Sequence, residues 1–148
     1  MTLTSYLFFD GTCREAFEFY ARVLDAKIEA MSTYGDMPPE AEGSSDPAEG
    51  CGALTPESRD RIMHAYLARG DAALMGSDSM PGQPFEGIKG CSVAIGTSDA
   101  AEAERVFHAL AEGGNVTLPL QATFWAERFG MLVDRFGVSW MVNCMNPA

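Results

Sequence analysis

Residues 3–24 read LTSYLFFDGTCREAFEFYARVL, and this stretch decides the fold. It opens with an apolar, β-prone run, which an Asp-Gly pair ends. Thr12 and Glu15 then stand three residues apart, as in the capping box at the start of a helix. The apolar residues that follow recur at helical spacing, and they are Cys13, Ala16, Phe17, Tyr20 and Leu24. A further strand is expected at about residues 27–34, so the order is strand, helix, strand.

The same order returns in the second half of the chain. Residues 91–114 read CSVAIGTSDAAEAERVFHALAEGG. Asp99 and Glu102 repeat the capping pattern, and a pair of glycines at 113–114 ends the helix. Asn115 to Leu120 then has the composition of a strand. The chain is therefore built from an internal repeat.

Each repeat continues with two further β-prone runs, at about residues 61–69 and 72–77, and at about 128–134 and 138–144. The pattern β-α-β-β-β is thus present twice. A ferredoxin-like domain would need a second helix in each repeat, and no second helical pattern is visible. The predicted class is α+β, a single domain over residues 1–148, with one βαβββ module at about 1–80 and another at about 88–148.

Residues 36–58 separate the second predicted strand from the third. They are rich in Pro, Gly, Ser and acidic residues, which is typical of a long surface loop. Such a loop is either simply mobile or a lid over a ligand site.

Composition limits the partners and the location of the protein. Lys and Arg total 10 against 21 for Asp and Glu, so the formal net charge is −11. This charge repels polyanions, which argues against nucleic acid and anionic membranes as partners. The four cysteines lack the spacing of zinc sites, and no apolar run reaches transmembrane length. Reduced thiols and a cytoplasmic location are expected.

Several motifs, taken in order, carry a resemblance to a known family. They lie at residues 6–16, 19–20, 34–36, 62–65, 75–78, 112–114, 124–125 and 134–140. Together they resemble the PhnB-like branch of the vicinal oxygen chelate superfamily, which includes glyoxalases, bleomycin-resistance proteins and dioxygenases. The resemblance implies curled mixed sheets around a cleft, usually in a homodimer.

This branch often carries a methyltransferase name tied to demethylubiquinone. A methyltransferase is expected to have a Gly-rich turn between a buried strand and a helix, where a nucleotide cofactor is held. The glycines of residues 90–96 flank a predicted strand instead. The methyltransferase activity is therefore not favoured, and no cofactor is expected.

The resemblance also implies metal ligands on the first and last strands of each module. Those positions fall near Ser5, Leu74 or Met75, Ser92 or Val93, and Met141. The residues one place away are Tyr6, Ala73, Ala94 and Trp140. None of these is a usual ligand for Ni, Zn, Mn or Fe, so no metal site is expected.

Five residues are candidates for a ligand pocket, namely His64, Met75, Trp125, Phe129 and Met141. The two methionines would form an adaptable floor, and the rings an apolar wall. His64 would make a hydrogen bond, although a histidine inside a strand can also be a satisfied core residue. The rings around Trp125 can equally be core or dimer contacts.

Three further residues have both a structural and a chemical interpretation. Asp78 follows a predicted strand and is either a turn former or a base. Cys13, at a predicted helix start, is either a reactive thiolate or a buried inert thiol. His108 lies between Glu104 and Glu112 on the second predicted helix, which indicates a solvated surface position.

The function predicted from these features is metal-independent binding of a small apolar or partly aromatic molecule, as in a sequestering resistance protein. One alternative is a metal-dependent enzyme of the lyase, dioxygenase or thiol transferase type. Another is a structural homodimer without a physiological ligand.

Overall fold

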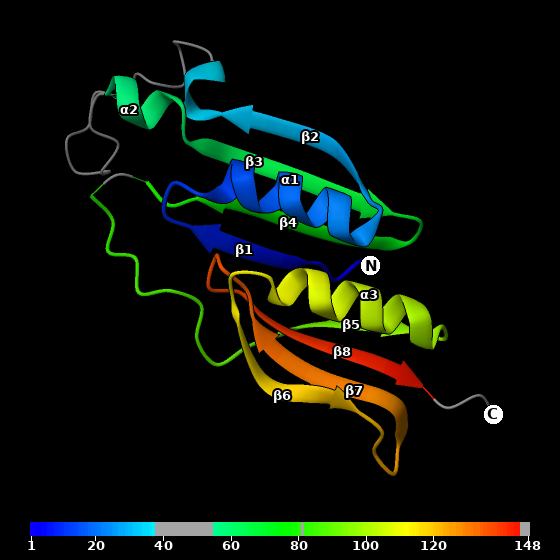
Figure 1. Ribbon diagram of the computed structural model, residues 1–148. Coiled ribbons are helices and arrows are strands. Elements are labelled where there is room, and N and C mark those ends of the chain that lie inside the picture. The colour runs from blue at the N-terminus through cyan, green and yellow to red at the C-terminus, as the bar shows by residue number, and fades with distance from the viewer. Residues whose placement is uncertain (38–54, 81, 146–148) are drawn as a thin grey trace. The chain divides into compact units, whose positions relative to one another are not determined.

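The computed structural model describes residues 1–37, 55–80 and 82–145. The chain divides into a first unit, residues 1–21 and 26–85, and a second unit, residues 22–25 and 86–148. The elements, in chain order, are β1 (Ser5–Phe9), α1 (Cys13–Leu24), β2 (Lys27–Thr33), the 3-10 helix η1 (Tyr34–Asp36), α2 (Pro56–Arg59), β3 (Ile62–Arg69), β4 (Ala72–Asp78), β5 (Val93–Thr97), α3 (Ala100–Ala111), β6 (Asn115–Gln121), β7 (Ala126–Val133) and β8 (Ser139–Met145) (Figure 1).

Each unit contains one four-stranded mixed sheet. The strand order is β1-β4-β3-β2 in the first sheet and β5-β8-β7-β6 in the second. The first strand of each unit runs parallel to the last, and the other neighbours are antiparallel. The predicted α+β class and the repeated β-α-β-β-β order are confirmed.

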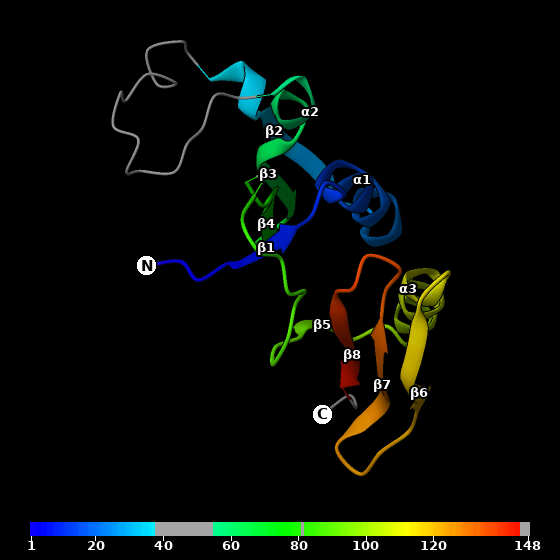
Figure 2. The ribbon, with the colours of Figure 1, turned by 90° about the vertical axis from the view of Figure 1, so that its left-hand side faces the viewer.

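One long helix covers one face of each sheet, as Figure 2 shows for α1 and α3. In the first unit the ring of Phe17 lies so close to Gly76 that an added Cβ atom would stand 2.8 Å from it. In the second unit Phe107 approaches Gly130 in the same way, at 2.6 Å. The core of each unit therefore lies between its helix and one sheet face, where Cys13, Ala16, Phe17 and Tyr20 of the predicted apolar stripe are buried. Leu24, at the end of α1, is only partly buried, and Val23 is buried instead.

The start of α3 confirms the cap expected from Asp99. Its carboxylate accepts hydrogen bonds from the backbone N–H groups of Ala101 and Glu102, at 2.9 and 3.3 Å. The Glu102 carboxylate accepts a 2.7 Å hydrogen bond from the Thr97 hydroxyl just before the helix. The second predicted helix thus begins where the sequence indicates.

The segment predicted as a surface loop, residues 36–58, has short helices at its ends. Helix η1 ends at Asp36, and α2 starts at Pro56 after Thr55, whose hydroxyl caps it by accepting from the Ser58 backbone. One helical turn is too short to produce a periodic pattern, so the sequence did not indicate either helix. Residues 38–54, on which the choice between a mobile loop and a lid depends, lie outside the described residues. In the described part of the chain, no helix combines the length and apolar composition needed to span a bilayer.

Candidate functional site

The face of the first sheet that α1 leaves uncovered carries a group of rings. Side chains alternate along a strand, so Leu7 and Phe9 of β1 turn to the helix while Tyr6 and Phe8 turn away from it. The strand register places Tyr6 beside Met75, and Met75 beside Tyr66. We call this surface the helix-free face of the first sheet; its residues are Tyr6, Phe8, His64, Tyr66 and Met75.

Tyr6 and His64 form a pair on this face. The Tyr6 hydroxyl lies 3.2 Å from His64 Nδ1, within hydrogen-bond distance, and the two rings stack with centroids 5.9 Å apart. Phe8 extends the group, with its ring centroid 5.2 Å from that of Tyr6. Tyr6 is 40% exposed and Phe8 is 55% exposed, although both are large apolar rings. Such rings are usually covered by a partner or a ligand.

The Tyr6–His64 pair fixes the orientation of a group that can both donate and accept. A neutral imidazole has one donor and one acceptor nitrogen, and Tyr6 engages Nδ1. Among the described residues, Nε2 of His64 has no hydrogen-bond partner. It is therefore available to a polar group of a molecule lying on the rings, as donor or acceptor according to the tautomer.

The second sheet has a helix-free face of its own. Trp140 and Val142 of β8 are buried toward α3, so Met141 and Asn143 turn to the other side. The register sets Phe129 opposite Asn143. The ring of Trp125 packs edge-on against that of Phe129, with centroids 5.5 Å apart, and Trp125 is 44% exposed. The helix-free face of the second sheet is defined by Trp125, Phe129, Met131, Met141 and Asn143.

All five predicted pocket residues belong to these two surfaces. His64 and Met75 lie on the helix-free face of the first sheet, while Trp125, Phe129 and Met141 lie on that of the second. Their assembly around one cleft would join the two units and stays a prediction. Sequence reasoning missed Tyr6, Phe8, Tyr66 and Asn143 as site residues. The sequence did carry one signal for these residues. The run of apolar residues in β1 makes both faces of that strand apolar, although the helix covers only one of them.

The positions implied for a metal are now placed by strand pairing. Tyr6 stands beside Met75 in the first sheet, and Ala94 stands beside Met141 in the second. Leu74 is buried on the helix side. A phenol, two thioethers and a methyl group do not fit a hard divalent cation. Within residues 1–37, 55–80 and 82–145, no three His, Cys, Asp or Glu side chains are grouped to hold a metal ion.

Asp78 and Cys13 have structural positions. The Asp78 carboxylate is buried and accepts hydrogen bonds from the backbone N–H groups of Gly11, Cys13 and Ile62, at 2.8, 3.0 and 2.8 Å. Burial, and then the negative charge of Asp78, raises the pKa of the Cys13 thiol to about 12. Asp78 thus ties the β1–α1 corner to β3, and Cys13 stays a protonated thiol rather than a nucleophile.

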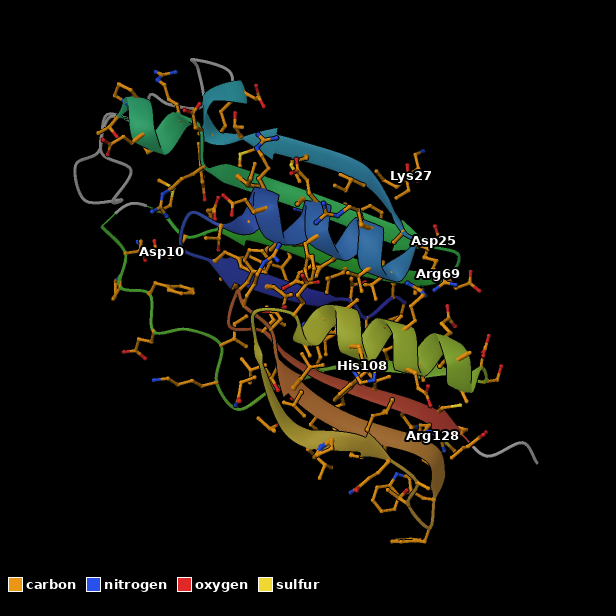
Figure 3. The ribbon with its side chains drawn as sticks, viewed as in Figure 1. Asp10, Asp25, Lys27, Arg69, His108 and Arg128 are labelled. Carbon is orange, nitrogen blue, oxygen red and sulfur yellow. The ribbon has the colours of Figure 1, made fainter. Side chains whose placement is uncertain are left out.

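His108 lies on α3 with an exposed side chain, as expected for a solvated helix face (Figure 3). On the same helix Glu104 forms an ion pair with Arg128 of β7, with Oε1 and Nε 3.2 Å apart. These exposed charges belong to the outer surface of the second unit, and their pairing contributes little to stability.

Comparison with known proteins identifies the family. The family model described as 3-demethylubiquinone-9 3-methyltransferase matches residues 48–143. A PhnB protein from Bacillus cereus has 26% identity, covers 97% of this chain and 99% of its own, and superposes with a TM-score of 0.73. The chain belongs to the PhnB-like family that this model describes.

Other relatives of this PhnB-like protein extend over nearly its whole length. Protein PA1353 from Pseudomonas aeruginosa is 49% identical, covers 99% of both chains and has a TM-score of 0.83. Protein YjdN from Escherichia coli strain K12 is 34% identical over 97% of this chain and 95% of its own. The fold also recurs in a glyoxylase/bleomycin resistance protein/dioxygenase domain from Frankia, with 13% identity, 99% and 98% coverage and a TM-score of 0.61. At 13% identity this last likeness is one of fold alone.

Proposed function

We propose that this PhnB-like protein binds a small, partly aromatic organic molecule in the cytoplasm without a metal ion. The observation that carries the proposal is the Tyr6–His64 pair, hydrogen bonded at 3.2 Å among exposed rings on the sheet face that α1 leaves uncovered. Rings supply an apolar surface, and one imidazole nitrogen supplies a polar contact. This combination is typical of small-molecule sites.

The expected affinity is modest. Covering an aromatic group on such a face contributes roughly 1.5–3 kcal/mol. A hydrogen bond to His64 adds about 0.5–1.5 kcal/mol and fixes the orientation of the ligand. Because neither contribution depends on a charge or a metal, binding should respond only weakly to salt.

The helix-free face of the second sheet offers an apolar surface of its own. Trp125, Phe129 and Met141 present two rings and a flexible thioether on its helix-free face. Trp125 carries the largest ring of the five candidate residues, so its truncation should weaken binding more than that of His64.

The methyltransferase activity in the family's name finds little support in the turns between strand and helix. After β1, the N–H groups of Gly11 and Cys13 donate to Asp78. After β5, those of Ala101 and Glu102 donate to Asp99. At each turn, two of the backbone donors that a nucleotide cofactor could use are therefore engaged by one of the protein's own carboxylates.

A ligand screen tests the proposal. Purified protein would be screened against aromatic metabolite-sized compounds by ligand-observed NMR, and each hit titrated against Phe8→Ala, His64→Ala and Trp125→Ala. We expect each variant to weaken binding, Trp125→Ala the most, whereas Val116→Ala, an exposed apolar control on β6, leaves it unchanged. Hits that bind all variants equally would refute the assignment of the site.

Elemental analysis separates the proposal from the metal-dependent alternative. Protein purified without chelator and desalted should carry far less than one equivalent of Ni, Zn, Mn or Fe. A stoichiometric metal that is lost on mutation of Tyr6 or His64 would contradict metal-independent binding and favour an enzyme of the lyase or dioxygenase type.

A further inference from the structure

One polar atom on the helix-free face of the second sheet lacks a partner. The side-chain oxygen of Asn143, Oδ1, is buried and accepts no hydrogen bond from the described residues. The amide nitrogen lies 3.0 Å from the sulfur of Met145, which is a weak acceptor. Turning the amide over would only exchange the positions of its oxygen and nitrogen, and the nitrogen would then be buried without an acceptor. A buried amide in this state indicates a missing hydrogen-bonding group.

The neighbours of Asn143 define what that group would belong to. On one side the register pairs Asn143 with Gly96 of β5, where an added Cβ atom would meet nothing within 4 Å. On the other side Asn143 stands opposite Phe129, against which Trp125 packs. The amide therefore lies between an open position and an aromatic wall.

The side chain of Met145 gives access to the amide. It is 54% exposed, and its sulfur contacts the side-chain nitrogen of Asn143. A thioether chain has several rotatable bonds and rearranges easily. Rotation of Met145 therefore uncovers the amide at the cost of one weak sulfur contact to its nitrogen.

We infer that Asn143 selects ligands in which an N–H or O–H group is attached directly to a neutral aromatic ring, as in indoles and phenols. The donor reaches Asn143 Oδ1, the ring packs beside Phe129, and the ligand fills the space over Gly96. This inference rests on the proposed function, to which it adds the ligand class and the residue that recognises it.

Indole and 1-methylindole provide a matched pair of probes, because they share a ring and differ in the N–H donor. Protein labelled with ¹⁵N would be titrated with each, following the side-chain amide of Asn143, with that of exposed Asn115 as the internal control. We expect indole to shift the Asn143 amide and to bind about 3- to 10-fold more tightly than 1-methylindole, the effect of one hydrogen bond.

Substitutions at two positions separate the effect of the hydrogen bond from that of the open space over Gly96. Asn143→Leu keeps a similar volume and should remove the preference for indole while both probes still bind. Gly96→Leu fills the open position and should remove binding of both, whereas Gly96→Ala retains it. Circular dichroism and thermal unfolding would verify that each variant is folded.

The outcomes are decisive for the two proposals separately. Equal binding of the probes to the wild type, an unmoved Asn143 amide, or full binding by Gly96→Leu overturns the role of Asn143. If aromatic ligands instead perturb His64 and Phe8 but leave Asn143 unchanged, the inference fails and the proposed function stands. If no aromatic compound of the wider screen perturbs either face, both fail.

Discussion

At the scale of single residues, Asp78 has the largest structural role that the contacts reveal. Its carboxylate receives three backbone N–H groups from two distant segments, and it is 2% exposed. Hydrogen bonds to a charged acceptor are stronger than those between neutral groups. The residue considered as a base in the sequence therefore acts as a structural anchor.

Asp78→Asn tests this role. The amide keeps the shape of the carboxylate but directs an N–H group at backbone donors, so at least one buried donor loses its acceptor. We expect a loss of about 2–4 kcal/mol in the free energy of unfolding, measured by urea denaturation. The same change at exposed Asp71 is the control and should cost under about 0.5 kcal/mol. Equal costs at the two positions would contradict the anchor.

Cysteine labelling checks the positions of the thiols. Cys13 and Cys144 are buried, whereas Cys91 is exposed. Iodoacetamide at pH 8 should modify Cys91 in the native protein and leave the other two unmodified, as read by peptide mass spectrometry. Modification of Cys13 at a rate comparable to Cys91 would be inconsistent with its burial.

The raised pKa of Cys13 should also make the stability of the protein depend on alkaline pH. Its pKa is raised from 9.0 to about 12 in the folded chain, so above pH 9 the unfolded chain binds fewer protons than the folded one. The contribution of the Cys13 thiol to the free energy of unfolding is therefore complete below pH 9, and it is lost as the pH rises toward 12. Urea midpoints measured from pH 8 to 10.5 should therefore fall more steeply for the wild type than for Cys13→Ala. If the urea midpoints of the wild type and of Cys13→Ala fall equally with pH, the raised pKa of Cys13 is contradicted.

Residue roles were predictable where their partners are near in sequence. The Asp99 cap was predicted because its donors follow within three residues. The anchoring role of Asp78 was not predicted, because its donors at Gly11 and Cys13 stand 67 and 65 positions away in the sequence. Only the assembled sheet brings them to its carboxylate. Asn143 was missed for the same reason, since only strand register places it beside Gly96 and Phe129.

At the scale of elements, each long helix presses one phenylalanine ring onto a glycine of the sheet. An added Cβ atom at Gly76 would stand 2.8 Å from the Phe17 ring and 2.9 Å from the carbonyl oxygen of Leu7. The backbone of β1 cannot move aside without breaking its pairing with β4. The close approach of helix and sheet thus depends on the missing side chain.

Replacing these glycines measures the cost of a single methyl group. Gly76→Ala should reduce the free energy of unfolding by about 1–3 kcal/mol, as overpacking does in cores. Gly96→Ala, at an exposed position of the edge strand β5 with open space, should change it by less than about 0.5 kcal/mol. The midpoints of urea unfolding would compare the two, and a tolerated Gly76→Ala would show that α1 can shift.

The sequence predicted the long helices and the strands well, because α1 and α3 each repeat apolar residues along one face. The sequence predicted less well which face of the first sheet is left uncovered by α1. β1 is apolar on both sides, so its composition does not tell which side the helix covers. Only the strand pairing and the contacts of Phe17 decide this.

At the scale of the whole molecule, we predict an isologous homodimer. Phe8 is 55% exposed and Phe124 is 94% exposed, and each open sheet has two edge strands. Light scattering coupled to gel filtration at micromolar concentration should give twice the chain mass of 15.9 kDa. A mass of one chain, independent of concentration, would contradict the prediction.

The parallel pairing of first and last strands in each unit has a consequence for the order of folding during synthesis. On the ribosome, β1 cannot pair with β4 until residues 72–78 have been synthesised. In the same way, β5 cannot pair with β8 until residues 139–145 have been synthesised. Hairpins such as β3–β4 and β7–β8 join strands that are adjacent in sequence and can form first. Each nascent unit therefore has an interval in which its opening strand is exposed and unpaired, which is when chaperone binding or misassociation is most favoured.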